Sequence, residues 1–285
     1  MTEATYDGGV AETRSEWLTR RPAPPVAPFV ERYVGYRLEG FPSGVHRGLP
    51  SRHLTFIVSI GPQIDVVAQT DPAQAPRTYR AVVSGLQASP ALIAHDGFQE
   101  GVAFELTPLG CRSLLGLPAR EIWNASLELE ELAGPIGVEL WERLQLAPGW
   151  PERFAICDEV LARLATDRRV EPALDRSWRL LTESAGTVAV ADLARTVGWT
   201  RQHFARRFVG EFGLSPKLAA RVVRFDRARR MLQAPFLSIA QVAHACGYYD
   251  QAHLTRDFRE LAGVSPARLL ADDLPSIQDV ESLPG

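Results

Sequence analysis

Arginine is the side chain with the clearest chemical use in this 285-residue chain. Thirty arginines stand beside a single lysine, Lys217. Between residues 186 and 272 the 13 basic residues outnumber the seven acidic ones, a local net charge of +6. The whole chain carries −3, so the remainder carries −9. A basic segment on an acidic protein is the electrostatic footprint of a phosphate-binding surface.

The basic segment also contains an internal repeat, in which apolar, glycine and basic positions recur. The first copy reads Gly198-Trp199, His203-Phe204, Arg206, Phe208 and Gly213-Leu214-Ser215-Pro216. The second copy reads Gly247-Tyr248, His253-Leu254, Arg256, Phe258 and Gly263-Val264-Ser265-Pro266. The offset is 49 residues before the turn and 50 after it, so the second turn is one residue longer. Matched positions of this kind indicate two copies of one supersecondary unit.

Each copy is typical of a helix, a tight turn and a second helix. Ser238 suits the N-cap of the first helix in the second copy, and Gly247 suits the left-handed position where that helix ends. Asp250 and, in the first copy, Thr200 are suited to cap the second helix of their units. The first copy opens more weakly, because Ala189 stands in the place of Ser238.

Ser-Pro pairs at 215–216 and 265–266 predict a further helix after each unit, with serine as cap and proline in the first turn. The helix after Ser215 should end before Pro235. At ~1.5 Å per residue it would span roughly 25 Å. A rigid spacer of that length suits two recognition helices about one DNA turn, ~34 Å, apart.

The paired motifs resemble the AraC/XylS family of bacterial transcription regulators. The strongest part of the resemblance is the run Gly247-Tyr-Tyr-Asp-Gln-Ala-His-Leu-Thr-Arg-Asp-Phe258, and the resemblance covers about 85 residues. It implies a seven-helix DNA-binding domain with a double helix-turn-helix. Two recognition helices would enter successive major-groove segments on one face of the duplex.

By motif position, the resemblance assigns the base-reading side chains to the exposed faces of the two recognition helices. They are Gln202, Ala205 and Arg206 in the first unit and Gln251, Ala252, Thr255 and Arg256 in the second. Arginine can bond guanine, glutamine can bond adenine, and threonine can meet a thymine methyl. The alanines offer only apolar contact, so the first helix would read fewer bases.

Simpler interpretations stand beside these assignments. A single copy would also suit a plain helical hairpin, whereas two copies around a spacer favour a DNA-binding module. His203 and His253 are better suited to packing or capping than to reading bases. A set of four arginines is open to two interpretations, as solvated charges or as phosphate contacts, and we expect about half to touch phosphate. The set is Arg207, Arg221, Arg224 and Arg230.

The first half of the chain predicts a β-rich domain over residues 21–117, after a flexible N-terminus at 1–20. Short β-branched or aromatic runs at 33–38, 53–60, 64–68, 79–84, 91–94 and 102–106 are separated by Gly, Pro and Asp. This spacing is typical of a small antiparallel barrel or sandwich. The expected fold class is α+β, with this sensor-like domain, a helical connector and an all-α C-terminal domain.

The connector is expected at 118–185, before the DNA-binding domain at 186–272 and a flexible tail at 273–285. Helical patterns cover 136–146 and 152–165, and Pro172 opens another helix with Leu174, Trp178 and Leu181 on one stripe. Core packing is the default interpretation of such tryptophans. A homodimer interface is the alternative, because aromatic residues are enriched at interface cores.

Other chemistry in the first half is sparse. Arg47, Arg52 and His53 flank a loop that leads into the most apolar strand, and they suit either an anionic ligand at a barrel mouth or a salt-bridged loop. His46, His53 and His95 lack the His-x-His pair of metal-binding barrels, so no metal and no other cofactor is expected. The chain has no nucleophile elbow or phosphate loop, and no catalytic residue is assigned.

These features predict a transcription regulator that binds promoter or operator DNA and responds to an unknown small-molecule effector, with RNA polymerase as a further partner. Neither a long apolar run nor a leader is present, and the three cysteines lack C-x-x-C spacing, so we expect a cytoplasmic protein with no membrane contact. Two rivals remain: a barrel-domain enzyme or repair protein carrying a DNA-binding tail, and a ligand-independent DNA binder.

Overall fold

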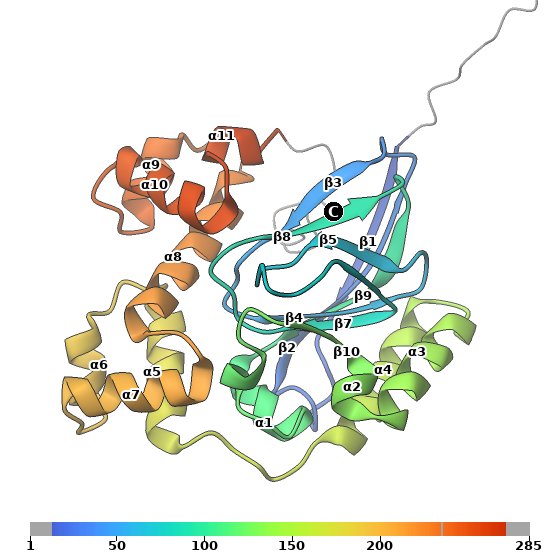
Figure 1. Cartoon of the computed structure of the whole chain (residues 1–285), viewed down its shortest axis with the longest axis horizontal. Coiled ribbons are helices and arrows are strands. Elements are labelled where there is room, and N and C mark those ends of the chain that lie inside the picture. The colour runs from blue at the N-terminus through green and yellow to red at the C-terminus, as the bar shows by residue number, and fades with distance from the viewer. Residues whose placement is uncertain (1–12, 235, 272–285) are drawn as a thin grey trace, which may run out of the picture.

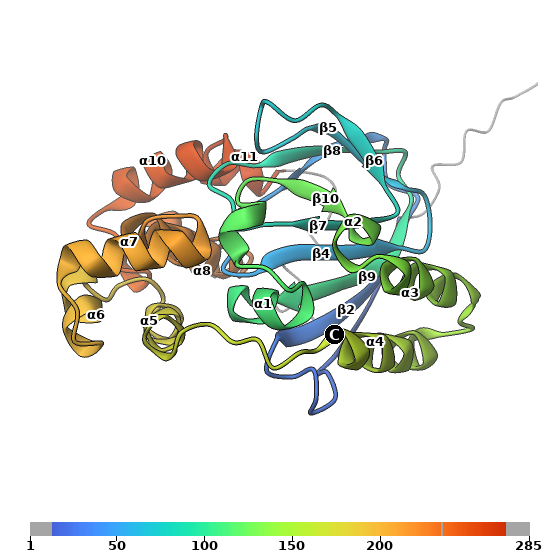
Figure 2. The same cartoon turned by 60° about the horizontal axis from the view of Figure 1, so that its bottom comes forward.

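The computed structural model describes residues 13–234 and 236–271. An N-terminal β-rich part is followed by helices that cover the large sheet and by a helical C-terminal part (Figures 1 and 2). The expected α+β architecture is confirmed, with two antiparallel sheets rather than one closed barrel among the described residues. None of the helices described there is both long and apolar enough to cross a membrane.

The large sheet has six strands in the order β1-β2-β9-β4-β7-β10. Its strands are β1 (Arg14–Arg20), β2 (Val30–Glu39), β9 (Gln99–Leu106), β4 (Leu54–Ser59), β7 (Ala81–Ser84) and β10 (Ser126–Glu128). The small sheet has four, in the order β3-β8-β5-β6. Its strands are β3 (Gly44–Gly48), β8 (Ala91–His95), β5 (Ile64–Ala68) and β6 (Arg77–Tyr79). The six predicted runs all fall on strands.

The large sheet is apolar on both faces. One face meets the small sheet through a cluster that includes Val66, Val82 and Ile93. The other face packs on helices, where Tyr33 of β2 lies against Phe154 at 5.9 Å between ring centroids. Burial on both faces explains why the central strands are rich in β-branched and aromatic residues.

The helices over the large sheet are α1 (Cys111–Leu114), α2 (Leu129–Ala133), α3 (Pro135–Leu146) and α4 (Trp150–Leu164), with 3₁₀ turns η1 (Pro108–Gly110) and η2 (Ala119–Ile122). Tyr33 donates to Asp158 of α4 at 3.0 Å, and Gln145 of α3 donates to the Ser59 carbonyl at 2.8 Å. The helices α3 and α4, predicted as a connector, therefore belong to the body of the β-rich domain.

Two expectations about the ends of this domain were wrong. Residues 14–20, expected to be flexible, form β1 and pair with β2 from Arg14↔Glu39 to Arg20↔Tyr33. This edge strand is largely exposed and is held by backbone pairing, so its sequence lacks an apolar period. Strand β10 lies within the predicted helical connector and pairs with β7, where the Ser84 and Ser126 hydroxyls are 2.8 Å apart. Residues 1–12 and 272–285 lie outside the described residues, so the whole of the tail expected at 273–285 does too.

Seven helices form the C-terminal part. They are α5 (Pro172–Glu183), α6 (Val190–Thr196), α7 (Arg201–Phe212), α8 (Pro216–Leu232), α9 (Ile239–Ala245), α10 (Gln251–Ala262) and α11 (Pro266–Leu269). Helix α5 packs on α6, α7 and α8. A DNA-binding domain that starts near residue 170, rather than 186, fits this packing.

The Trp178 stripe is covered within the chain. Trp178 is 4 % exposed, and its ring centroid lies 6.1 Å from that of Phe208 and 4.8 Å from that of Phe212, both on α7. Core packing, the default interpretation of this stripe, is confirmed, and the alternative of a subunit interface is wrong, because the first helix-turn-helix unit already buries the stripe.

Replacing Trp178 with alanine should therefore destabilise the full chain by about 3–5 kcal/mol, since a large buried aromatic leaves a cavity. Denaturant unfolding measures this loss. The matched control is Leu146→Ala, whose side chain is 84 % exposed and whose loss should cost no more than about 0.5 kcal/mol. A change in sedimenting species without a loss of stability would contradict the intramolecular packing.

A histidine pair lies on the small sheet. The rings of His46 (β3) and His95 (β8) are 5.5 Å apart between centroids. Burial, together with His95, lowers the pKa of His46 from 6.5 to about 4. Below pH 6.5 the His46 imidazole binds a proton in the unfolded chain but stays neutral in the folded chain. The free energy of unfolding should therefore fall as the pH is lowered to about 4.

Between pH 7 and pH 5, the melting temperature of the His46→Gln variant should fall less than that of the wild type. The reason is that glutamine does not titrate, so the variant lacks this proton linkage. His244→Gln, at an exposed position on α9, is the control and should follow the wild type. Parallel curves for the His46→Gln variant and the wild type would rule out the proposed effect.

Candidate nucleic-acid interface

The first helix-turn-helix unit consists of α6 and α7. Helix α6 begins after Ala189, which makes no side-chain capping bond. Gly198 has a φ of +73°, and the Thr200 hydroxyl accepts from the backbone N–H of His203 at 3.2 Å to start α7. Phe204, Phe208 and Phe212 are fully buried and fix the inward face of α7.

The second unit consists of α9 and α10, with stronger caps. Ser238 and Gln241 form a capping box at the start of α9. Gly247 has a φ of +73°, and the Asp250 carboxylate accepts from the backbone N–H of His253 at 2.7 Å. The predicted caps and turn glycines of both units are confirmed.

The turns differ by one residue, as the repeat predicts. Trp199 and Tyr248 occupy matching positions, and each meets a histidine edge-on: His203 at 4.8 Å and His253 at 5.1 Å between ring centroids. The additional residue of the second turn is Tyr249, which is 93 % exposed. The two histidines therefore pack against the turns, in keeping with the structural interpretation.

The faces of α7 and α10 that the sequence assigns to base reading point away from these cores. Gln202 and Arg206 are exposed on α7, and Ala205 is partly exposed. The exposed residues on α10 are Gln251, Ala252 and Arg256, while Thr255 is partly exposed. Arg206 lies 3.4 Å from Nδ1 of His203, and the Thr255 hydroxyl donates to the Gln251 carbonyl at 2.9 Å. Each set of assigned base-reading residues thus occupies one solvent-facing side of its helix.

Several other arginines already have partners within the chain. Arg207 pairs with Glu171, just before α5. Arg221 of α8 pairs with Asp257 of α10 at 2.8 Å and also with Glu260. Arg224 donates to the Gly186 carbonyl at 3.0 Å. Arg230 pairs with Asp226 at 2.9 Å. These four side chains brace the helices, so phosphate contact by any of them would compete with an internal bond.

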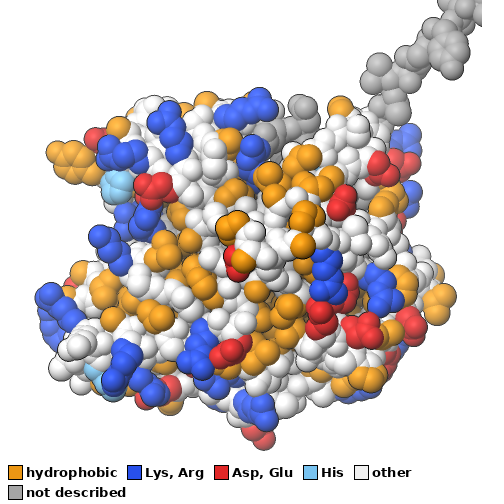
Figure 3. Space-filling model, viewed as in Figure 1, with side chains coloured by type: hydrophobic (Ala, Val, Ile, Leu, Met, Phe, Trp, Pro, Cys, Tyr) orange, Lys and Arg blue, Asp and Glu red, His pale blue; other side chains and the backbone are white. Residues whose placement is uncertain are grey.

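Basic and acidic side chains gather on different parts of the surface. On the face drawn in Figure 3, Lys and Arg side chains gather over α6, α7 and α9–α11. Acidic side chains are more frequent over α2–α4. A polyanion such as duplex DNA is attracted to the first region and repelled by the second.

The β-rich domain contacts both helix-turn-helix units. Arg112 of α1 makes two 2.8 Å hydrogen bonds to Glu211 at the end of α7, and Glu211 is 5 % exposed. A Cβ at Gly213 would lie 2.6 Å from that of Trp123. Leu49, from the loop after β3, is buried in the apolar cluster of the second unit. The repeat carries no signal for these contacts, because their partners lie far away in the sequence.

The three candidate ligand residues of the first half do not line one common cavity. Arg47 lines a space between the two sheets, with His46 and Gln87. Arg52 and His53 line a different pocket, beside α5. There Nη2 of Arg52 and Nε2 of His53 lie 2.8 and 3.1 Å from Oε2 of Glu31. The geometry of Arg52 and His53 corresponds to the salt-bridged alternative.

One group among the described residues has metal-ligand types. Glu31, His53 and Glu105 have donor atoms within 4.8 Å of one another. Arg52 engages Glu31, and Arg32 engages Glu105 at 2.6 Å. Burial alone would raise the pKa of Glu31, but His53 and Arg52 outweigh it and hold that pKa at about 2. With arginines already neutralising both carboxylates, this group is an ionic network and a poor cation site.

The arrangement of α5–α11 defines a double helix-turn-helix DNA-binding domain. The family model described as "Helix-turn-helix domain" matches residues 193–272. Together with the AraC-like relatives, this match confirms the resemblance of the C-terminal domain to AraC-type regulators. A putative AraC-like transcription regulator of Streptomyces lividans is 31 % identical over 118 residues, covering 41 % of this chain and 34 % of that protein.

Two further likenesses extend the comparison. The HTH-type transcriptional regulator GlxA of Rhizobium meliloti is 32 % identical over 118 residues, 41 % of this chain and 33 % of that protein. The chain thus spans about a third of the length of these curated relatives. ToxT from Vibrio cholerae has a similar fold, with a TM-score of 0.51 and 12 % identity over 84 % of this chain and 97 % of ToxT.

Arg206→Ala and Arg256→Ala should each weaken binding to the preferred DNA site by about 1–3 kcal/mol and relax the choice at one base pair. Selection of sites from random duplexes, followed by titration, measures both effects. Arg195→Ala, on the exposed side of α6 and paired with Asp192, is the control. An unchanged consensus for the Arg256→Ala variant would show that α10 does not read bases through this side chain.

Proposed function

We propose that this protein is a sequence-specific DNA-binding transcription regulator whose β-rich domain senses a small molecule. The observation that carries the proposal is the pair of solvent-facing surfaces on α7 and α10, each on a helix whose opposite face is buried. Arg and Gln side chains on these surfaces suit bidentate contacts with guanine and adenine edges. Because α8 joins the two units directly, both recognition helices can engage one duplex.

Regulation would follow from the contacts between the two domains. The Arg112–Glu211 bond and the Leu49 contact tie the β-rich domain to the first and second units respectively. A ligand that favours one arrangement of these contacts changes DNA affinity by the corresponding coupling free energy. The AraC-type relatives named above support a role in transcription, and contact with RNA polymerase is the proposed route to activation.

We assign the protein no enzymatic reaction and place it in the cytoplasm, where it would meet its DNA target. A homodimer is compatible with this proposal, although its interface must use a surface other than the Trp178 stripe. The rival enzyme or repair function predicts turnover by the β-rich domain. The ligand-independent alternative predicts DNA binding that no small molecule changes. Turnover assays and ligand-dependent DNA titrations separate these alternatives.

A fragment covering residues 170–272 should bind duplex DNA and weaken steeply between about 50 and 200 mM salt, since binding releases counterions. Fluorescence anisotropy at several salt concentrations measures the slope. A shorter fragment, 186–272, should be less stable because it lacks α5 and the Trp178 contact with α7. DNA affinity of the longer fragment that does not change with salt would remove the phosphate-binding role of the basic segment.

A further inference from the structure

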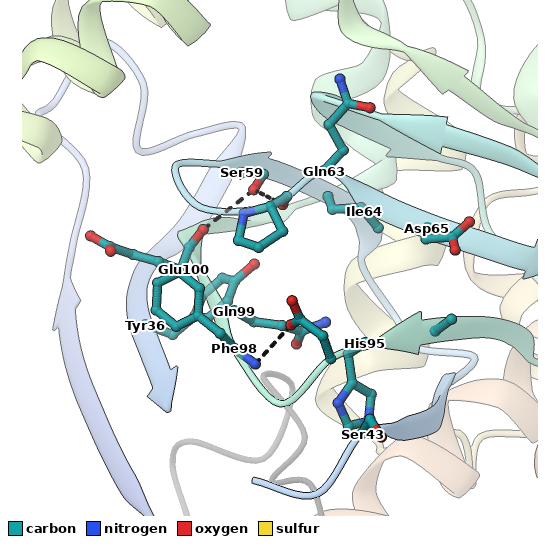
Figure 4. Close-up of a pocket in the computed structure, with 13 residues that line it drawn as sticks. Tyr36, Ser43, Ser59, Gln63, Ile64, Asp65, His95, Phe98, Gln99 and Glu100 are labelled. Atoms are coloured by element: carbon teal, nitrogen blue, oxygen red, sulfur yellow. Dashed lines mark hydrogen bonds between the residues drawn. The ribbon is translucent and has the colours of Figure 1, made fainter. Parts of the chain in front are cut away.

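A cavity of about 400 Å³ opens at one end of the β-sandwich, beside Tyr36 (Figure 4). Two of the acidic side chains that line it already have partners within the chain. Glu100 pairs with Arg153 at 2.7 Å and with Arg37 at 3.6 Å, and Asp96 accepts from a nearby backbone N–H at 3.0 Å. The lining of this cavity therefore does not single out the chemical class of a ligand.

An exposed tyrosine in the second helix-turn-helix unit is in a different situation. Tyr249 lies between α9 and α10 and is 93 % exposed. Within the part of the chain that the structure describes, its side chain makes no hydrogen bond and no ring contact. The preceding Tyr248 is only 4 % exposed and packs edge-on against His253. A single exposed aromatic is ordinary on a protein surface, so the place of Tyr249 in the turn decides what it can do.

The backbone on which the Tyr249 side chain stands is held firmly. Its N–H donates to Nδ1 of His253 at 3.4 Å. The next residue, Asp250, accepts from the backbone N–H of His253 at 2.7 Å and so caps α10. Because the turn is already ordered, a partner that binds Tyr249 has to immobilise only the side chain, which keeps the entropic cost of binding small.

The turn places Tyr249 next to the start of the second recognition helix. Gln251 and Ala252 open α10 and are exposed. The N-terminal residues of a recognition helix are the ones that contact base edges in the major groove. Tyr249 precedes these residues and lies outside the helix, which suits the rim of the groove, where the sugar–phosphate backbone runs. The first unit has no equivalent side chain, because its capping residue Thr200 directly follows Trp199.

Positive charge lies beside the same turn. The Arg224 guanidinium lies over the Tyr248 ring at 5.4 Å from the centroid. Arg227, three residues further along α8, is exposed. Burial raises the pKa of the Cys246 thiol at the end of α9, and both arginines oppose that rise because they lie close to it. The carboxylate of Asp250, which caps α10, is the acidic group next to Tyr249. A phosphate that approaches the turn therefore meets two nearby cations, which attract it.

We propose that Tyr249 contacts the sugar–phosphate backbone of DNA beside the bases that α10 faces. The Tyr249 hydroxyl donates to a phosphate oxygen, and the ring packs against the adjacent deoxyribose. Tyrosine is among the side chains that bond to phosphate oxygens in protein–DNA complexes, and such contacts fix the position of the protein without reading sequence. The inference rests on the proposed function, and it adds a DNA-contacting residue that the first unit lacks.

Tyr249→Phe in the full chain removes only the hydroxyl. Its affinity for the duplex that the wild type selects from random sequences should fall about three- to tenfold, as expected for one lost hydrogen bond to a charged group. Affinity for an unrelated duplex should fall by the same factor, and the selected consensus should stay unchanged, because a phosphate contact carries no sequence information. Tyr249→Ala should lose at least as much, since the ring contact is lost too. Fluorescence anisotropy gives the dissociation constants.

Leu146→Ala is the matched control, because it also removes a large exposed side chain, 84 % exposed against 93 % for Tyr249. Leu146 ends α3, which the β-sandwich separates from α10 (Figure 1). This variant should bind DNA like the wild type. All of the variants should keep the wild-type melting temperature, because an exposed side chain contributes little to stability.

Duplexes that carry one neutral methylphosphonate at successive positions identify the phosphate. At the contacted position, the substitution should weaken the wild type but should have little further effect on the Tyr249→Phe variant, because both changes remove the same bond. Losses that add at every position would overturn the phosphate contact.

Two further outcomes would also overturn the inference: equal affinities of the wild type, Tyr249→Phe and Tyr249→Ala, or a changed consensus for Tyr249→Ala, which would make Tyr249 a base reader. The same titrations keep the two proposals apart. A wild type that selects a consensus and is unaffected by these substitutions contradicts only the Tyr249 contact. A wild type that selects no consensus contradicts the proposed function itself.

Discussion

Helix α8 must be covered on most of its circumference, and the placement of the other C-terminal helices depends on this constraint. Ten of its 17 residues are buried. Among them is Arg229, which is 1 % exposed and lies 2.9 Å from the equally buried Asp226. Burial alone would raise the pKa of Asp226, but Arg230 and Arg229 outweigh it and keep the carboxylate ionised. A buried charge that loses its partner is strongly destabilising, so this helix cannot be exposed without a large loss of stability.

Four surfaces supply the cover that α8 requires: helix α5, the two helix-turn-helix units and the β-rich domain. The first unit contacts its beginning, the second unit lies along its later turns, and the β-rich domain approaches near Arg230, which lines a pocket with His53 and Phe104. The spacer between the recognition helices is therefore also the element on which the two domains meet. A shift of either domain acts on the same helix, so in the proposed function α8 would carry the coupling between sensing and DNA binding.

The local features of the C-terminal half could be predicted from sequence because they depend on neighbours along the chain. Caps such as Thr200 and Asp250 act within one helical turn, and the glycines mark backbone conformations that other residues avoid. Most strands of the β-rich half were also predictable, from β-branched and aromatic runs between Gly, Pro and Asp, although β3 was not predicted. By contrast, β1 lacks an apolar period because it is an exposed edge strand, and the partner of Trp178 lies 30 residues away on another helix. The roles of Arg207 and Arg221 and the cavity beside Tyr36 arise only from tertiary packing.

Tyr249, the additional residue of the second turn, makes the two reading units distinguishable. A chain whose two units differ and are joined in a fixed order can bind a given duplex site in only one orientation. Turned end for end, it would set α10 over the bases that suit α7. The DNA target of the proposed regulator would therefore have a direction and would not need two-fold symmetry. The strand that carries the target would then decide whether the acidic β-rich domain faces toward or away from the neighbouring gene.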